Sequence, residues 1–263
     1  MLRPRPIRAT ASLLVILTLW LSPKAVEASK LILALGDASY LPGETVKGWT
    51  GAEVKQELGD RELTEFALII LSNVAYGALP LGVREQLVEY LNKGGSILIS
   101  GGASAYGSGG YDAAAHILPF EIRAQQDWRA GPFKPVIPVQ PDHPILSGVT
   151  FASIGTFNDL NPRAGATEIA RYAGGGTAAG ARFASPLIAE RPVGQGTVLG
   201  IAFDLGQEAR SGWANGARFL QNLLAYLVAR SPLEPKPEPT EKADEPGAIP
   251  GESEPGKIPG ERR

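Results

Sequence analysis

The sequence predicts a three-layer α/β domain, built on a doubly wound and mostly parallel sheet. Short, continuously apolar runs alternate with a segment of helical periodicity, as expected for strands that are covered on both faces. Glycine-rich turns bound these runs. Between two ends of different composition lie about 200 residues, enough for one domain with a well-buried core.

Three apolar runs in the first half are expected to be buried strands: Leu31–Leu35, Phe66–Leu71 and Ser96–Ser100. Between the second and third runs, apolar residues from Leu81 to Leu91 repeat with helical spacing. Pro80 suits the first turn of this helix, and Gly94-Gly95 ends it. A strand–helix–strand unit of this kind indicates parallel strands joined by a right-handed crossover.

The second half is expected to add four strands and two helices. Pro192–Gly196 reads as a tight hairpin connection between the last two strands. Apolar residues on one face predict an amphipathic closing helix at Gly216–Val228. A shorter helix is expected at Tyr111–Leu118. The four strands are expected at Val136–Val139, Glu168–Tyr172, Leu187–Arg191 and Val198–Phe203.

Residues 1–28 have the pattern of a signal peptide. Arg3, Arg5 and Arg8 precede the apolar run Ala11–Leu21, and Val26 and Ala28 suit the −3 and −1 positions of a cleavage site. This pattern predicts export to the periplasm, the extracellular space or the cell surface. Retention of the segment as an uncleaved anchor is the alternative, and it is the one membrane attachment that the sequence suggests.

Residues 231–263 form a tail dominated by proline, glycine and glutamate, a composition typical of disorder. Within the tail, the segment Glu245–Glu252 recurs as Glu254–Glu261, which suits either a linker or a partner-binding motif. The globular domain is therefore expected at residues 29–230.

Composition excludes several classes of function. The net charge is −2 with no basic block, which argues against nucleic-acid binding. The chain has no cysteine, so disulfides, thiolate metal sites and a cysteine nucleophile are absent. Its two histidines are far apart in sequence and lack ligand spacing, so we expect no metal site and no cofactor.

The glycine-rich segment after the third strand is the main candidate for ligand binding. Ligands sit at the carboxyl ends of strands in doubly wound sheets, and glycines let the backbone approach them closely. A purely structural turn is the alternative, and no Gly-Lys-Ser/Thr follows to make a phosphate loop. Near other strand ends, Asn73, Asp204, Asp37 and Asp159 could line the same pocket or cap turns. The candidate loop residues are Gly101, Gly102, Ala103, Ser104, Tyr106, Gly109, Gly110 and Tyr111.

Several segments together resemble a known family. They are FALIILSNVAYGALP, VREQLVEYLNKGGSILISGG, SAYGSGGYDAAAHILPFEI, Asp142–Ile145, the PLIAERPVGQGTVLGIAFD hairpin and the last helix. In this order they resemble the glutamine amidotransferase domain of bacterial surface and membrane proteins, in the class I glutamine amidotransferase-like superfamily. They also resemble trehalose-utilisation-type domains of that superfamily. The resemblance covers roughly Leu31 to Arg230.

The resemblance implies a non-catalytic member of the superfamily. Its enzymes place a nucleophilic cysteine on the turn after this strand, with histidine and glutamate after a later strand. Here the turn is Gly101–Ser104, and Asp204–Glu208 supplies an acid without a histidine. We therefore expect no catalytic residues, and binding of a small molecule or a protein partner at the loop.

An enzyme remains the alternative. Ser104 would replace the missing cysteine, with His143 as its base, or a carboxylate would act instead. His143 itself lies in the turn Pro141–Ile145 and is either a structural turn residue or, as the resemblance implies, a ligand-binding residue beside the pocket. The other histidine, His116, is expected to be a structural residue of the short helix.

Overall fold

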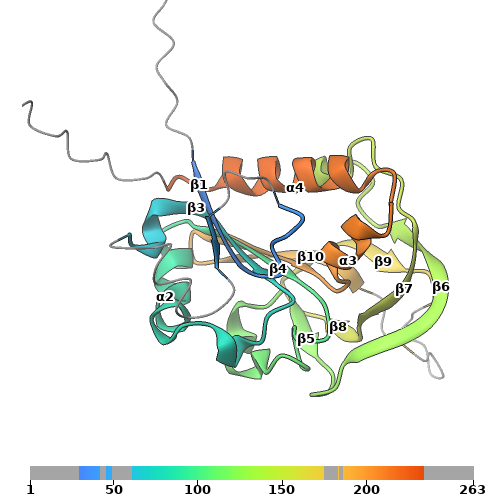
Figure 1. The fold of residues 1–263 in the computed structure, drawn as a ribbon, viewed down its shortest axis with the longest axis horizontal. Coiled ribbons are helices and arrows are strands. Elements are labelled where there is room, and N and C mark those ends of the chain that lie inside the picture. Colours follow the sequence, from blue (N-terminus) through green and yellow to red (C-terminus); the bar gives the residue numbers. More distant parts are fainter. Residues whose placement is uncertain (1–29, 42–45, 49–60, 175–182, 184–185, 234–263) are drawn as a thin grey trace, which may run out of the picture.

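The computed structural model describes residues 30–41, 46–48, 61–174, 183 and 186–233 (Figure 1). The predicted signal segment, and the tail beyond residue 233 with its repeat, lie outside the described residues. Within the described part of the chain, no helix is both long and apolar enough to cross a membrane.

A nine-stranded sheet runs through the centre of the domain (Figure 1). Its strands are, in spatial order, β2 (Val46–Gly48), β1 (Leu31–Gly36), β3 (Phe66–Ser72), β4 (Ser96–Ser100), β11 (Gly196–Ile201), β10 (Pro186–Val193), β9 (Thr167–Tyr172), β6 (Trp128–Pro138) and β7 (Ser153–Asn158). A second small sheet pairs β5 (Phe120–Ile122) with β8 (Leu160–Pro162). The predicted α/β class is therefore confirmed.

The sheet is mixed, so the expectation of a mostly parallel sheet is wrong for its second half. From β2 to β11 every described pairing is parallel, whereas from β11 to β7 every pairing is antiparallel. The physical reason is the type of connection. Parallel neighbours need a long crossover, usually a helix, but a tight turn joins β10 to β11 and no α-helix occurs between β6 and β10 in the described residues.

Helices lie on both sides of the sheet (Figure 1). On one side, α2 (Leu81–Asn92) buries Val83, Leu87 and Leu91. On the other side lie α3 (Leu205–Arg210) and α4 (Gly216–Arg230), and α4 buries one apolar stripe. The predicted helices are confirmed, although the one at Tyr111–Leu118 is a 3-10 helix. The 3-10 helices are η1 (Leu63–Glu65), η2 (Tyr76–Ala78), η3 (Tyr111–Ile117) and η4 (Pro144–Leu146).

The core is centred on the parallel strands. Every residue of β3 and β4 is buried. Ile70 and Ile99 are fully buried on these two neighbouring strands, where Leu71 pairs with Ile99. The prediction that Phe66–Leu71 and Ser96–Ser100 form buried strands is confirmed. Their carboxyl ends point to the same edge of the sheet, which is where the candidate loop begins.

Candidate functional site

Asn73 joins the carboxyl ends of three parallel strands. It follows β3, its side-chain Oδ1 accepts the backbone N–H of Ser104 at 2.8 Å, and its Nδ2 donates to Asp204 at 3.0 Å. Ser104 belongs to the loop after β4, and Asp204 follows β11. Three of the residues predicted from the sequence are therefore brought together by one side chain.

Two residues near the site have left-handed backbone conformations. Asn73 has φ 44° and Tyr106 has φ 46°, and they are the non-glycine residues with positive φ in the described ranges. Asparagine tolerates this region, whereas a tyrosine there is strained unless its surroundings hold it. The buried Tyr106 hydroxyl donates to the carbonyls of Ile99 and Ile201, at 3.0 and 3.1 Å.

Two buried polar residues, Asp127 and Asn158, hold the glycine-rich loop Gly101–Tyr111 in place on its buried side. The carboxylate of Asp127 accepts the backbone N–H groups of Gly107 and Ser108 and the Ser108 hydroxyl, at 2.8–3.0 Å. Asn158 accepts the N–H of Gly102 at 2.9 Å and donates to Asp127 at 3.0 Å. Both residues are buried, so these contacts fix the loop independently of solvent. Neither residue was predicted from the sequence.

Carboxylates gather at the same edge of the sheet. Asp204 caps α3 by accepting the N–H of Gln207 at 2.9 Å. Burial raises the pKa of Asp204, and the nearby charge of Asp37 adds to the rise. Burial also raises the pKa of Glu208, as does the charge of Asp204. Charge repulsion and partial burial thus make these two carboxyls easier to protonate.

Asp37 behaves in the opposite way. Burial alone would raise its pKa, but hydrogen bonds from Arg210 and Ser39 outweigh burial and hold the pKa below its usual value. Its carboxylate lies 2.8 Å from the Arg210 guanidinium. Asp159 is separate from this group, because it pairs with Arg123 at 2.7 Å.

The predicted loop residues divide into an exposed rim and a buried base. Ala103, Ser104 and Gly110 are exposed. The others are buried, and Tyr111 donates its hydroxyl to the Val74 carbonyl at 3.0 Å. Tyr106 and Tyr111, which were both predicted as ligand-binding candidates, are buried, and their hydroxyls hold the loop against the sheet.

The structure does not bring Ser104 and His143 together. The His143 ring packs edge-on against Tyr226 of α4, and its Nε2 lies 3.7 Å from Glu190 of β10. His116 is exposed in η3. Neither histidine contacts Ser104, so the described residues provide no histidine base for a serine nucleophile.

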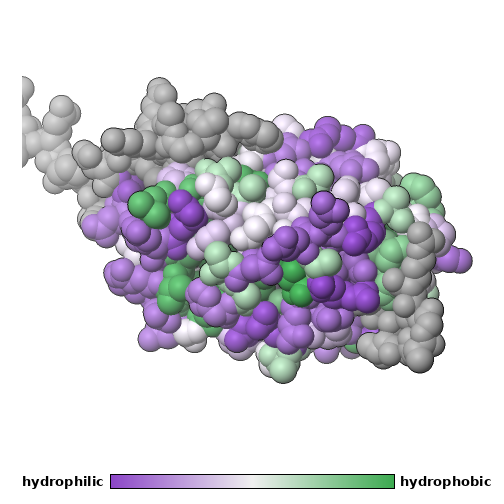
Figure 2. Space-filling view, turned by 90° about the horizontal axis from the view of Figure 1, so that it is seen from below, coloured by the Kyte–Doolittle hydropathy of each residue, from purple (hydrophilic) through white to green (hydrophobic). Residues whose placement is uncertain are grey.

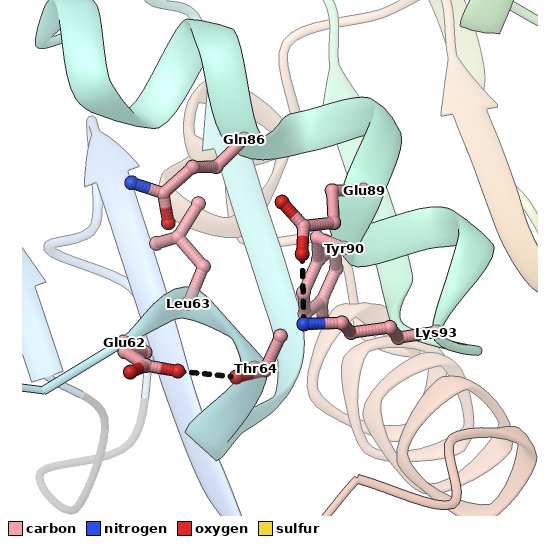
Figure 3. A pocket seen from close by; sticks show the side chains of 7 residues that line it. All are labelled: Glu62, Leu63, Thr64, Gln86, Glu89, Tyr90 and Lys93. Atoms are coloured by element: carbon pink, nitrogen blue, oxygen red, sulfur yellow. Dashed lines mark hydrogen bonds and ion pairs between the residues drawn. The ribbon is translucent and has the colours of Figure 1, made fainter.

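No cluster of three or more histidine, cysteine, aspartate or glutamate side chains suited to a metal occurs among the residues that the structure describes. Two hollows lie elsewhere on the surface. One, of about 350 Å³, lies between η1 and α2 and is lined by Glu62, Gln86, Glu89 and Lys93 among others (Figure 3). The other, of about 500 Å³, is apolar and lies between Leu41 and the outer face of α4. Neither hollow includes a predicted site residue.

The face seen in Figure 2 mixes hydrophilic and hydrophobic side chains. Its green areas are small and separated by polar residues over the described part of that face. This face therefore offers no single extended apolar surface.

Two glycines of the loop give a matched test of the Asn73 contact. Gly102 has φ 141°, and a Cβ there would lie 2.2 Å from the Asn73 side chain. Gly110 has φ 74°, and a Cβ there would meet open space. Both alanine variants carry a backbone cost of about 1–3 kcal/mol. We expect Gly102→Ala to lower the free energy of unfolding in urea by at least about 2 kcal/mol more than Gly110→Ala. Equal losses would show that the Asn73 side chain moves aside freely.

Comparison with solved structures identifies the fold, whereas comparison of sequences identifies no family. No protein-family model matches the chain, and no curated protein matches it. Among solved structures, the cytoplasmic protein STM3548 from Salmonella typhimurium is similar, with a TM-score of 0.58 at 16% identity over 75% of this chain and 98% of that one. The cytoplasmic protein STM1381 from Salmonella typhimurium LT2 gives 0.60 at 16% identity, over 74% and 98%.

A ThuA-like protein from Bacteroides uniformis gives a TM-score of 0.52 at 13% identity, over 78% of this chain and 94% of that one. At such identities the likeness shows the fold, which is α/β, and nothing about activity.

The comparisons correct the predicted location. Export to the periplasm or cell surface was expected from residues 1–28, which lie outside the described residues. The two Salmonella structures that share the fold are named cytoplasmic proteins. The prediction of an exported protein is therefore withdrawn.

Proposed function

We propose that this chain is a non-catalytic member of the class I glutamine amidotransferase-like fold, which binds a small molecule or a protein partner. The binding site is the carboxyl edge of the parallel strands, above the Gly101–Tyr111 loop. The similarity to a ThuA-like protein supports this fold assignment, since ThuA-like proteins have a class I glutamine amidotransferase-like fold. The observation that carries the binding site is the Asn73 bridge between Ser104 and Asp204.

The chain directions around Asn73 favour a crevice at this point. The chain leaving β3 and β4 continues toward α2 and η3, on one side of the sheet (Figure 1). The chain leaving β11 continues into α3 and α4, on the other side. Ligands of open α/β sheets bind where neighbouring connections diverge in this way.

The proposed absence of catalysis rests on the missing nucleophile–base pair. We expect no ammonia release from glutamine by the purified protein, and no change in any hydrolytic rate in Ser104→Ala. Losing a complete nucleophile–base unit typically removes about 10⁶-fold of rate. Ammonia release that disappears in Ser104→Ala would overturn the non-catalytic proposal.

The binding site is tested by a thermal-shift screen against amino acids, sugars and nucleotides. A ligand that binds only the folded state raises its melting temperature. We expect a compound that stabilises the wild type to lose its effect in Asn73→Gly, which keeps the backbone conformation accessible and removes the amide. Gln86→Ala in the hollow of Figure 3 is the control. A shift lost in Gln86→Ala but kept in Asn73→Gly would place the site in that hollow instead.

A hydrolase that uses carboxylates is the second candidate. It is favoured by the raised pKa values of Asp204 and Glu208, because a general acid must hold its proton near the working pH. Glu208→Gln separates this candidate from pure binding. Loss of a hydrolytic activity in that variant, with ligand-induced stabilisation unchanged, would favour the enzyme.

A further inference from the structure

An exposed apolar surface lies away from the candidate site, on β6 in the antiparallel half of the sheet (Figure 1). Phe133 is 77% exposed, Ile137 is 44% exposed and Val139 is 37% exposed. Pro135, which lies between them, is also exposed. Side chains at alternate positions of a strand share one face, so these four form a continuous apolar row. We call residues 132–142 the β6 strip, in which Val136 is the buried residue.

The strip offers its side-chain face to a partner, not a free backbone edge. β6 lies between β9 and β7 in the sheet, and its sequence WRAGPFKPVIP contains three prolines, which have no N–H to donate. The pairing continues past the end of β6, because the N–H of Val139 donates to the Ile169 carbonyl at 2.8 Å. The strip is therefore held extended before any partner arrives, so little ordering entropy is lost on binding.

The sequence of the strip is nearly symmetric about Pro138. Residues at equal distances from Pro138 match in chemistry, and the pairs are Ile137 with Val139, Pro135 with Pro141, and Lys134 with Asp142. The last pair carries opposite charges, and both of its members are exposed. Neither Lys134 nor Asp142 forms an ion pair with another residue that the structure describes.

Such a strip is complementary to a second copy of itself that runs in the opposite direction. A two-fold axis brings residue i of one copy to residue j of the other, and residue j to residue i. With the axis at Pro138, aliphatic residues meet aliphatic residues and prolines meet prolines. Lys134 of each copy meets Asp142 of the other, so the charges attract at both ends of the strip.

We propose that the β6 strip is the interface of a symmetric dimer, in which two copies of the chain pack strip against strip around Pro138. The strip supplies about ten residues from each copy, against about 20–30 in a protein interface of standard size. The dimer is therefore in equilibrium with the monomer at micromolar concentrations.

The first test is sedimentation velocity of the full chain over a series of micromolar concentrations. We expect the wild type to shift from monomer to dimer as the concentration rises. Phe133→Glu should raise the dissociation constant at least about tenfold, since a buried aromatic side chain is a typical hot spot of an interface. Leu81→Glu is the matched control, because Leu81 is 61% exposed on α2, away from the strip. It should leave the equilibrium unchanged, and circular dichroism checks that each variant is folded.

Reversal of the charges at the two ends tests the antiparallel arrangement itself. Lys134→Glu alone and Asp142→Lys alone should each raise the dissociation constant roughly tenfold, because two symmetry-related attractions become repulsions. The double variant, Lys134→Glu with Asp142→Lys, should restore the wild-type value. A partner other than a second copy would not produce this rescue.

Three results would overturn the proposal. One is a wild type that stays monomeric at every concentration, and another is a dimer that Phe133→Glu leaves intact. The third concerns residues 234–263, which could occupy the strip in place of a second copy. We expect their removal to leave the dissociation constant unchanged. A chain that dimerises only after their removal would show that they cover the strip instead.

Discussion

Replacing Ile99 with aspartate should abolish soluble expression of the domain. Ile99 is fully buried in β4, where it pairs with Leu71 on one side and Gly200 on the other. A carboxylate at this position would have no charged partner, and an unpaired buried charge costs several kcal/mol. Because a domain of this type is stabilised by about 5–15 kcal/mol in total, the variant should not fold.

The measurement is the soluble fraction after expression, compared with Ile99→Val as the control. Valine removes one methylene group and should cost about 0.5–1.5 kcal/mol, which leaves the domain folded. A soluble aspartate variant with a cooperative melting transition would contradict the placement of β4 at the centre of the sheet.

The second large effect is expected for Asp127→Ala, on the buried side of the glycine-rich loop. The change leaves the N–H groups of Gly107 and Ser108 and the amide of Asn158 without their buried acceptor. Each unsatisfied buried donor costs about 1–3 kcal/mol, so we expect the free energy of unfolding in urea to fall by roughly 3 kcal/mol or more.

Asp112→Ala is the control for this prediction, because Asp112 follows the same loop and its side chain is exposed. It should change the free energy of unfolding by less than about 0.5 kcal/mol. If both variants lost similar amounts, Asp127 would be no more than a surface charge, and the description of the loop as held on its buried side would be wrong.

The strands that could be predicted from the sequence are those whose own residues are continuously apolar. β3 reads FALIILS and β4 reads SILIS, and both are buried along their whole length. β6 shows the opposite case. It starts at Trp128, but it is largely exposed and contains three prolines, so only its end near Val136 carried a strand signal. β7 was also missed, although it is mostly buried, because Ile154 and Phe157 are its only large apolar residues.

The candidate site was predicted where residues adjacent to strand ends define it, and missed where distant segments meet. Asn73 and Asp204 directly follow apolar strands, so the geometry of a parallel sheet places them at one edge. Asp127 and Asn158 follow no such rule. Asp127 precedes β6 and Asn158 ends β7, so both reach the loop through strands of the antiparallel half. The pairing of these strands cannot be read from the local sequence.

The position of β11 has a consequence for how the chain assembles. β11 completes the parallel half by pairing Thr197 with Ser96, a partner about 100 residues earlier in the chain. Contacts this distant in sequence slow folding, because closing a long loop costs entropy before any contact is gained. During synthesis at about 5–20 residues per second, β4 would wait on the order of 5–20 s for that neighbour. Throughout this interval β4, whose three central residues are apolar, has one open edge, which is the arrangement most prone to pair with another chain. The β10–β11 hairpin, which is local in sequence, can form first and close that edge in a single step.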